Sequence, residues 1–155
     1  MNKKRIYIAG AISDNNLLNS WENIRKGIKL SVEVLKAGFA PFSPWLDYNF
    51  QLQLRDGESL SVDDYYAYSM TWLEASDIVY VIPGWENSKG TLAEISRANA
   101  LNIPVVYSMT DLKKVAENVS YHKKLKANIA HLESTENMLN SLDETSKDKE
   151  FMMQL

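Results

Sequence analysis

The segment "PGWENSKGTLAE", residues 83–94, carries the side chains with the clearest potential for chemistry. It follows an apolar run and leads into a helical pattern, so it connects a strand to a helix. Gly84 and Gly90 permit close approach of the backbone to a ligand. Ser88 and Thr91 supply hydroxyls at the expected helix N-terminus, where backbone N–H groups bind phosphate or carboxylate. The segment predicts an anion site, although helix capping explains the same hydroxyls.

Glu94 stands in the first turn of the expected helix, within reach of a sugar phosphate bound at residues 88–91. A carboxylate there makes a favourable contact with the helix dipole. Carboxylates are also the preferred nucleophiles at anomeric carbons, whose transition states are positively charged. Tyr7, near the end of the first expected strand, is placed to orient Glu94 by a hydrogen bond, or is simply a strand aromatic. We therefore treat Glu94 and Tyr7 as candidate catalytic residues.

The composition of the 155-residue chain limits the classes of function. A net charge of −3 gives no electrostatic reason to bind nucleic acid polymers or anionic membranes. The absence of cysteine excludes disulfides and thiolate metal sites, and two separated histidines, His122 and His131, make no ligand cluster, so no metal or redox cofactor is expected. No run approaches the ~20 apolar residues of a membrane span. The N-terminal apolar run is too short for a secretory signal, and we expect a cytoplasmic protein.

Hydrophobic patterns predict strands that alternate with helices. This alternation indicates a parallel sheet covered on both faces, in a doubly wound, flavodoxin- or Rossmann-like α/β fold of four to five strands. Ligands bind such sheets beyond the carboxyl ends of the strands. The first helix is expected to bury the stripe Leu17, Trp21, Ile24, Ile28, Val32 and Leu35. The expected strands are 5–12, 39–44, 77–83 and 103–108. The expected helices are 17–37 and 91–101, and residues 70–76 are expected to end a further helix.

Two segments do not follow this alternation. Residues 45–68 are irregular, aromatic and acidic, as in a lid or binding loop. Residues 111–155 form a helical extension with a sparse apolar stripe, which either packs on the sheet or makes a subunit contact, and residues 143–150 are expected to be a frayed tail. The domain division is therefore an α/β domain at 1–110, followed by the extension and tail at 111–155.

Two common nucleotide-binding motifs are missing. No G-x-G-x-x-G follows the first expected strand, and no G-x-x-x-x-G-K-[ST] occurs in the chain. Hydride transfer to a nicotinamide and P-loop phosphoryl transfer are therefore disfavoured.

Four segments, "IYIAGAIS", "GFAPFSP", "WLEASDIVYVIPGW" and "SKGTLAEISRANALNIPVV", together resemble the nucleoside 2-deoxyribosyltransferase-like superfamily over about residues 5–107. The likeness is greatest to its short, often phage- or prophage-borne members. It implies a five-stranded doubly wound fold, a homo-oligomer and cleavage of an N-glycosidic bond. By the same resemblance, Glu94 attacks C1′ of the sugar and Tyr7 holds Glu94.

The resemblance also bears on the substrate, a small nucleotide or nucleoside. Family members that act on free nucleosides tend to carry Asp six residues before the glutamate, whereas hydrolases of nucleoside 5′-monophosphates carry Ser, as this chain does at Ser88. A 5′-monophosphate is therefore expected. Ser88, Gly90 and Thr91 would bind the phosphate, with Gly10 and Ser13 completing the cradle. Trp45 is among the aromatic residues expected to sandwich the base.

One position departs from the family pattern. Ser69 replaces an Asp that serves as general acid or base at the leaving base. Asp63 and Asp64, upstream, are the candidates to replace it, and we take Asp64 as the third catalytic residue. Three functions stay open: an N-glycosidase or deoxyribosyltransferase, a non-catalytic nucleotide-binding protein, and a phosphoribohydrolase of the lysine-decarboxylase-like type. The last group has a tighter "PGGxGT" turn than this chain.

Overall fold

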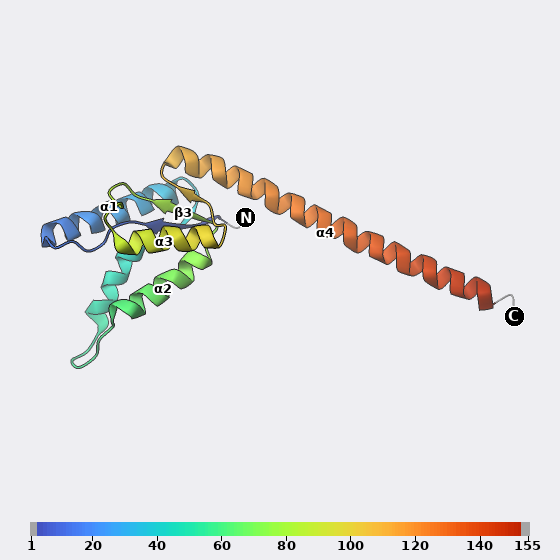
Figure 1. Cartoon of the computed structure of the whole chain (residues 1–155), viewed down its shortest axis with the longest axis horizontal. Helices are drawn as coiled ribbons and strands as arrows, with labels where there is room; N and C mark the ends of the chain where they lie inside the picture. Colours follow the sequence, from blue (N-terminus) through green and yellow to red (C-terminus); the bar gives the residue numbers. More distant parts are fainter. Residues whose placement is uncertain (1–2, 153–155) are drawn as a thin grey trace. The chain divides into compact units, whose positions relative to one another are not determined.

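The computed structural model describes residues 3–152, except for the side chains of 122–124, 136 and 139–152. The chain forms two compact units, residues 1–116 and 117–155. The first unit ends a few residues after the boundary expected at 110. Figure 1 labels most of the elements, which are, in order, β1 (Arg5–Ala9), α1 (Leu17–Lys36), β2 (Ala40–Phe42), η1 (Pro44–Gln53), α2 (Val62–Glu74), β3 (Ile78–Val81), α3 (Lys89–Ala100), β4 (Val105–Val106) and α4 (Met109–Met152).

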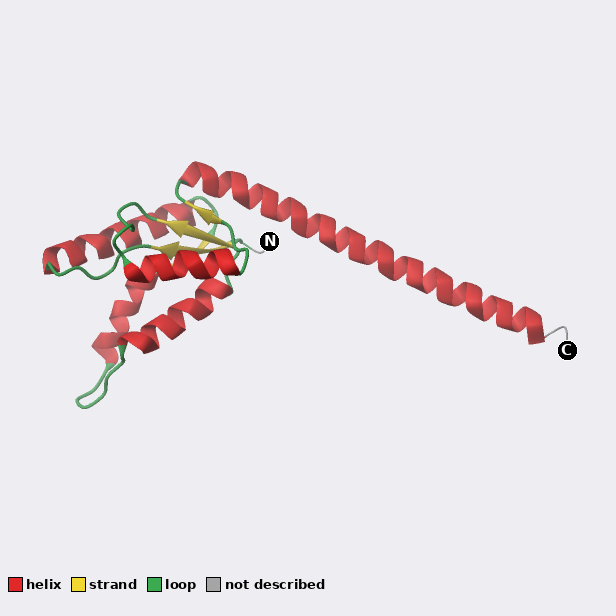
Figure 2. Ribbon diagram, in the orientation of Figure 1, coloured by secondary structure: helices red, strands yellow, loops and turns green. Residues whose placement is uncertain are grey.

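The first unit is built on a parallel sheet with the strand order β2-β1-β3-β4, flanked by helices (Figure 2). β1 pairs with β2 on one side and with β3 on the other. The strand order therefore reverses between β1 and β3, where their carboxyl ends open a crevice for ligands. The doubly wound α/β fold is confirmed, with four strands among the described residues.

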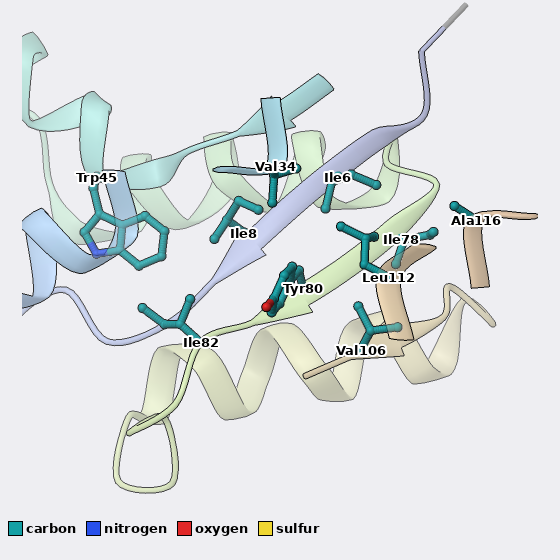
Figure 3. Close-up of a cluster of buried hydrophobic side chains, with 10 residues drawn as sticks. All are labelled: Ile6, Ile8, Val34, Trp45, Ile78, Tyr80, Ile82, Val106, Leu112 and Ala116. Atoms are coloured by element: carbon teal, nitrogen blue, oxygen red, sulfur yellow. The ribbon is translucent and has the colours of Figure 1, made fainter. Parts of the chain in front are cut away.

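β1 divides the core into two layers because successive side chains of a strand point to opposite faces. Ile6 and Ile8 join one cluster, while Tyr7 and Ala9 join the other. Helix α1 and the first turns of α4 cover the first cluster, and α2 and α3 cover the second. The first cluster, drawn in Figure 3, is Ile6, Ile8, Val34, Trp45, Ile78, Tyr80, Ile82, Val106, Leu112 and Ala116.

The buried face of α1 differs from the predicted stripe. Leu17, Trp21, Val32 and Leu35 are about half exposed or more. The buried residues are Gly27, Ser31 and Val34, with Ile24 and Ile28 packed at the edge of the core. The Trp45 ring lies so close to Gly27 that a Cβ there would come within 2.0 Å of it. Small residues make this contact, and a pattern of large apolar residues does not reveal it.

Residues 45–68 are not an irregular loop. Pro44 begins the 3₁₀ helix η1, and α2 already starts at Val62. Ser61 and Asp64 form a capping box at its N-terminus: Ser61 Oγ accepts from the Asp64 N–H, and the Asp64 carboxylate accepts from the Ser61 N–H. The acidic cluster that suggested a loop is therefore a helix start. Residues 54–61 remain a connection between helices.

Helix α4 contributes to both units. Leu112 and Ala116 belong to the first core cluster, whereas Leu125, Ile129 and Leu132 in the second unit are exposed. The helix also continues through residues 143–150, so the predicted frayed tail is wrong for the backbone. Among the described residues, no helix combines the length and apolar character needed to cross a bilayer. The side chains of His122 and Leu139 lie outside the described residues.

The contact between Gly27 and Trp45 predicts a sharp steric effect. Gly27→Ala places a methyl group inside the volume of the Trp45 ring. Helix propensity favours alanine, but overpacking of this kind costs about 1–3 kcal/mol of unfolding free energy or more. Urea unfolding measures the change, with Lys29→Ala on the exposed side of α1 as the control. An unchanged or raised stability of Gly27→Ala would contradict the packing described.

Candidate active site

Tyr7 and Glu94 form a buried hydrogen-bonded pair. The Tyr7 hydroxyl, at the centre of β1, donates to Oε1 of Glu94 in the second turn of α3 at 2.6 Å. Tyr7 has no exposed surface and Glu94 is 9% exposed. The second oxygen, Glu94 Oε2, is buried without a hydrogen-bond partner among the described residues. The structure thus brings together the two residues that the sequence singled out, with one carboxyl oxygen held and the other unpartnered.

Burial controls the ionisation of this pair. It raises the pKa of Glu94 to about 7, against the opposing effect of the Tyr7 hydrogen bond. Burial, followed by the Glu94 charge, raises the pKa of Tyr7 well above its ordinary value, so Tyr7 remains a phenol that donates. Near neutral pH, both the carboxylate and the carboxylic acid of Glu94 are populated. A carboxylate in such surroundings is poorly solvated and therefore reactive.

Two further polar side chains approach Tyr7. Ser69, on α2, forms a hydrogen bond with Tyr7 that lowers its pKa, and the Asp47 charge acts in the opposite direction. Asp47, in the first turn of η1, is only 8% exposed, and burial raises its own pKa to about 6. Asp47 is not among the site residues predicted from the sequence. Its signal was a single carboxylate within the otherwise apolar run "PWLDY".

The N-terminus of α3 is capped by Ser88. Its Oγ accepts hydrogen bonds from the backbone N–H of Thr91 at 3.3 Å and from Thr91 Oγ1 at 2.9 Å. Gly84 has φ +90°, which only glycine adopts readily, and turns the chain towards the cap. A Cβ at Gly90 would come 2.7 Å from the Tyr66 hydroxyl, so glycine there allows Tyr66 of α2 to approach the helix. Ser88 therefore caps α3, as the sequence allowed. Because its Oγ only accepts in these two bonds, its hydroxyl hydrogen can be donated to a ligand.

A polar pocket of about 340 Å³ lies between the segments that follow β1 and β3. It brings Ser13 and Ser88 together from the two loops, as the crevice between β1 and β3 requires. Among the described side chains, no group of three His, Asp or Glu is placed to hold a metal ion. The residues lining the pocket are Ala11, Ser13, Asp14, Asn19, Glu22, Asn23, Lys26, Gly84, Asn87 and Ser88.

Trp45 and Gly10, expected at the ligand, serve the core instead. Trp45 is 1% exposed and lies within the first cluster (Figure 3), where its Nε1 donates to the Ala11 carbonyl at 3.2 Å. Its ring is therefore not open for stacking on a base. A Cβ at Gly10 would come 2.2 Å from the Ile82 side chain. Close packing thus accounts for the glycine.

Asp64, the expected acid, is an exposed capping residue. Its Oδ2 accepts from the Ser61 N–H at 2.8 Å and from Ser61 Oγ at 2.7 Å. The hydrogen bond from the Ser61 side chain, followed by that from its backbone, lowers the pKa of Asp64. Within the described part of the chain, no interaction joins Asp64 to Tyr7 or Glu94. The structure does not bring Asp64 into the buried pair, because the start of α2 uses its carboxylate.

The raised pKa of Glu94 predicts how stability depends on pH. The folded state binds a proton that the unfolded state releases between pH 4.5 and about 7, so the unfolding free energy falls as pH rises through this range. The fall in unfolding free energy caused by Glu94 is on the order of 3 kcal/mol over this range, and Glu94→Gln removes it. Chemical unfolding at a series of pH values measures the slope. We expect a flatter profile for Glu94→Gln, a residual slope of the same sign from Asp47, and the wild-type profile for the exposed control Glu86→Gln. An equal slope in Glu94→Gln would contradict the assignment.

Comparisons with known proteins place the chain in a family. Among solved structures, it is similar to a 2-deoxyribosyltransferase from Bacillus psychrosaccharolyticus, with 21% identity, a TM-score of 0.48 and coverage of 65% of this chain and 69% of that one. No curated protein matches the chain. Residues 4–107 match the family described as a domain of unknown function, DUF4406. The match spans most of the chain and all four strands, and the protein therefore belongs to the DUF4406 family.

Proposed function

We propose that this protein cleaves the N-glycosidic bond of (deoxy)nucleoside 5′-monophosphates, with Glu94 as the nucleophile. The proposal is carried by the buried Tyr7–Glu94 pair, in which one carboxyl oxygen is held at 2.6 Å and the other has no partner among the described residues. Water as the acceptor gives hydrolysis, and a second base gives glycosyl transfer.

The pair suits a double displacement. Glu94 Oε2 attacks C1′ of the sugar while the bond from C1′ to the base nitrogen breaks and its electron pair leaves with the base. Water or another base then attacks C1′ and releases Glu94 as a carboxylate. Tyr7 keeps the carboxyl plane fixed by its bond to Oε1, and the dry setting leaves the attacking oxygen without solvent to displace.

The pocket beside Ser88 supports a phosphate-bearing substrate. Two carboxylates line it: Asp14 accepts a hydrogen bond from the Asn16 N–H at 2.7 Å, and Glu22 pairs with Arg25 at 3.8 Å. Lys26 is the cation among the residues that line the pocket. Together with the Ser88 hydroxyl and the N-terminus of α3, it offers a phosphate both positive charge and donors. Ser13 lines the same pocket and adds a hydroxyl.

The sequence resemblance supports the same roles for Glu94, Tyr7 and Ser88. It favours this reaction over that of the lysine-decarboxylase-like phosphoribohydrolases, since six residues separate Gly84 from Gly90 in place of their tight two-glycine turn. A second candidate is a protein that binds nucleotides without cleaving them. It is favoured by Ser69, which contacts Tyr7 where the resemblance calls for an acid.

Release of free base is the direct test. The purified protein is incubated with each common ribo- and deoxyribonucleoside 5′-monophosphate and with the matching nucleosides, and the products are separated by chromatography. We expect base from a monophosphate, and a loss of kcat by roughly 10³-fold or more in Glu94→Ala, because the nucleophile is removed. Exposed Glu86→Ala, from the loop before α3, is the matched control and keeps wild-type rates.

Tyr7→Phe separates the role of the hydroxyl, which holds the Glu94 carboxyl, from the packing of the ring in the core. Loss of the hydroxyl leaves the ring in the core but frees the Glu94 carboxyl, so kcat falls by roughly 10- to 100-fold while KM changes little. A different result would support the second candidate function. If wild type releases no base from any substrate, but a monophosphate raises its melting temperature, the protein binds nucleotides without cleaving them.

A further inference from the structure

A second buried carboxyl, that of Asp47, lies beside the Tyr7–Glu94 pair. Its charge acts on the Tyr7 hydroxyl in the same direction as that of Glu94, and more weakly. The proposed reaction lacks a proton donor for the departing base. Ser69 is not an acid, and the exposed Asp64 carboxylate accepts hydrogen bonds from Ser61 at the start of α2. Asp47 is thus a second buried carboxyl that could take this role.

The surroundings hold Asp47 in a fixed position. Phe42, the last residue of β2, pairs with Tyr7 across the sheet, and η1 begins two residues later. Trp45, two residues before Asp47, is locked between Gly27 of α1 and the Ala11 carbonyl. Asp47 Oδ2 has no hydrogen-bond partner among the described residues, so the packing of this segment is what positions the side chain. Rigid placement of this kind is what a catalytic group requires.

Three buried side-chain oxygens have no hydrogen-bond partner among the described residues: Ser43 Oγ, Asp47 Oδ2 and Glu94 Oε2. Buried polar atoms are rarely left in this state, and each exception calls for an explanation. Ser43 follows β2 directly, Asp47 is in the next turn, and Glu94 is bonded to Tyr7 of the neighbouring strand. A polar ligand that reached these atoms would satisfy them.

We infer that Asp47 is the general acid of the reaction proposed above, and this inference rests on that proposed function. As Glu94 attacks C1′ and the C1′–N bond breaks, the Asp47 carboxyl gives its proton to the base nitrogen that receives the electron pair. In hydrolysis, the resulting Asp47 carboxylate takes a proton from the water that attacks C1′ and releases Glu94. The sum is one nucleotide and one water converted to free base and sugar phosphate.

The contacts of the two carboxyls separate their roles. Glu94 accepts a hydrogen bond from Tyr7, which favours its charged form. Asp47 Oδ2 is buried without a donor, which favours the neutral form. Burial raises the pKa of Asp47 to about 6 and that of Glu94 to about 7. Between these values a part of the molecules carries a neutral Asp47 together with a charged Glu94, the combination that nucleophilic attack with acid assistance needs.

The test compares two leaving groups in the same variant. One substrate is the nucleoside 5′-monophosphate that wild type cleaves best, and the other is the 4-nitrophenyl β-glycoside of the same sugar 5-phosphate, whose phenolate leaves without a proton. In Asp47→Asn, we expect kcat/KM for the nucleotide to fall by ~10²–10⁴-fold, and that for the nitrophenyl substrate to stay within roughly 10-fold of wild type. In Glu94→Ala, both fall together. Exposed Asp56→Asn is the matched control.

The ratio of kcat/KM for the two substrates distinguishes a lost proton donor from misfolding, because a partly unfolded variant loses both activities in proportion. Equal losses in Asp47→Asn, or no loss for the nucleotide, would overturn the role of Asp47 while leaving the Glu94 mechanism intact. Wild-type protein that releases neither base nor nitrophenol would overturn the proposed function and this inference with it.

Discussion

The hydrogen bond between Tyr7 and Glu94 is the interaction on which the site depends. It joins two residues that are 87 positions apart in sequence, one from the central strand and one from the helix that packs on it. The bond forms because the alternation of β1 sends Tyr7 towards α2 and α3, while Ile6 and Ile8 fill the opposite layer. A shift of one residue in the strand would exchange the two faces and remove the pair.

Capping and small residues set the distances around this pair. Ser88 begins α3 at the point from which Glu94 reaches the sheet, and glycine at 90 admits Tyr66 to the same end of the helix. On the other side of the sheet, Gly27 admits the Trp45 ring, which fixes the start of η1 and with it Asp47. Local packing on both layers thus determines where the polar groups stand.

The electrostatics follow from burial. Glu94 and Asp47 each lose solvation, and the pKa of each rises into or near the neutral range. Tyr7 compensates Glu94 with a hydrogen bond, whereas Asp47 Oδ2 has no donor among the described residues. Retaining such groups lowers stability, a pattern typical of functional sites, where polar atoms await a ligand. The polar pocket at Ser13 and Ser88 adds the donors suited to a phosphate.

The alternation of strands and helices, and with it the doubly wound sheet, could be predicted from the sequence, because hydrophobic periods and helix caps are local signals. The sequence also identified Tyr7 and Glu94, since residue type and distance along the chain from a predicted strand can both be taken from it. It misplaced Trp45 and Asp64, whose aromatic and acidic side chains serve packing and capping as readily as catalysis.

Tertiary structure alone decided the buried face of α1, the start of α2 and the position of Asp47. Each depends on contacts between segments distant in sequence, such as that of Trp45 with Gly27, and the cost of burying a carboxyl appears only when the segments that exclude water are in place.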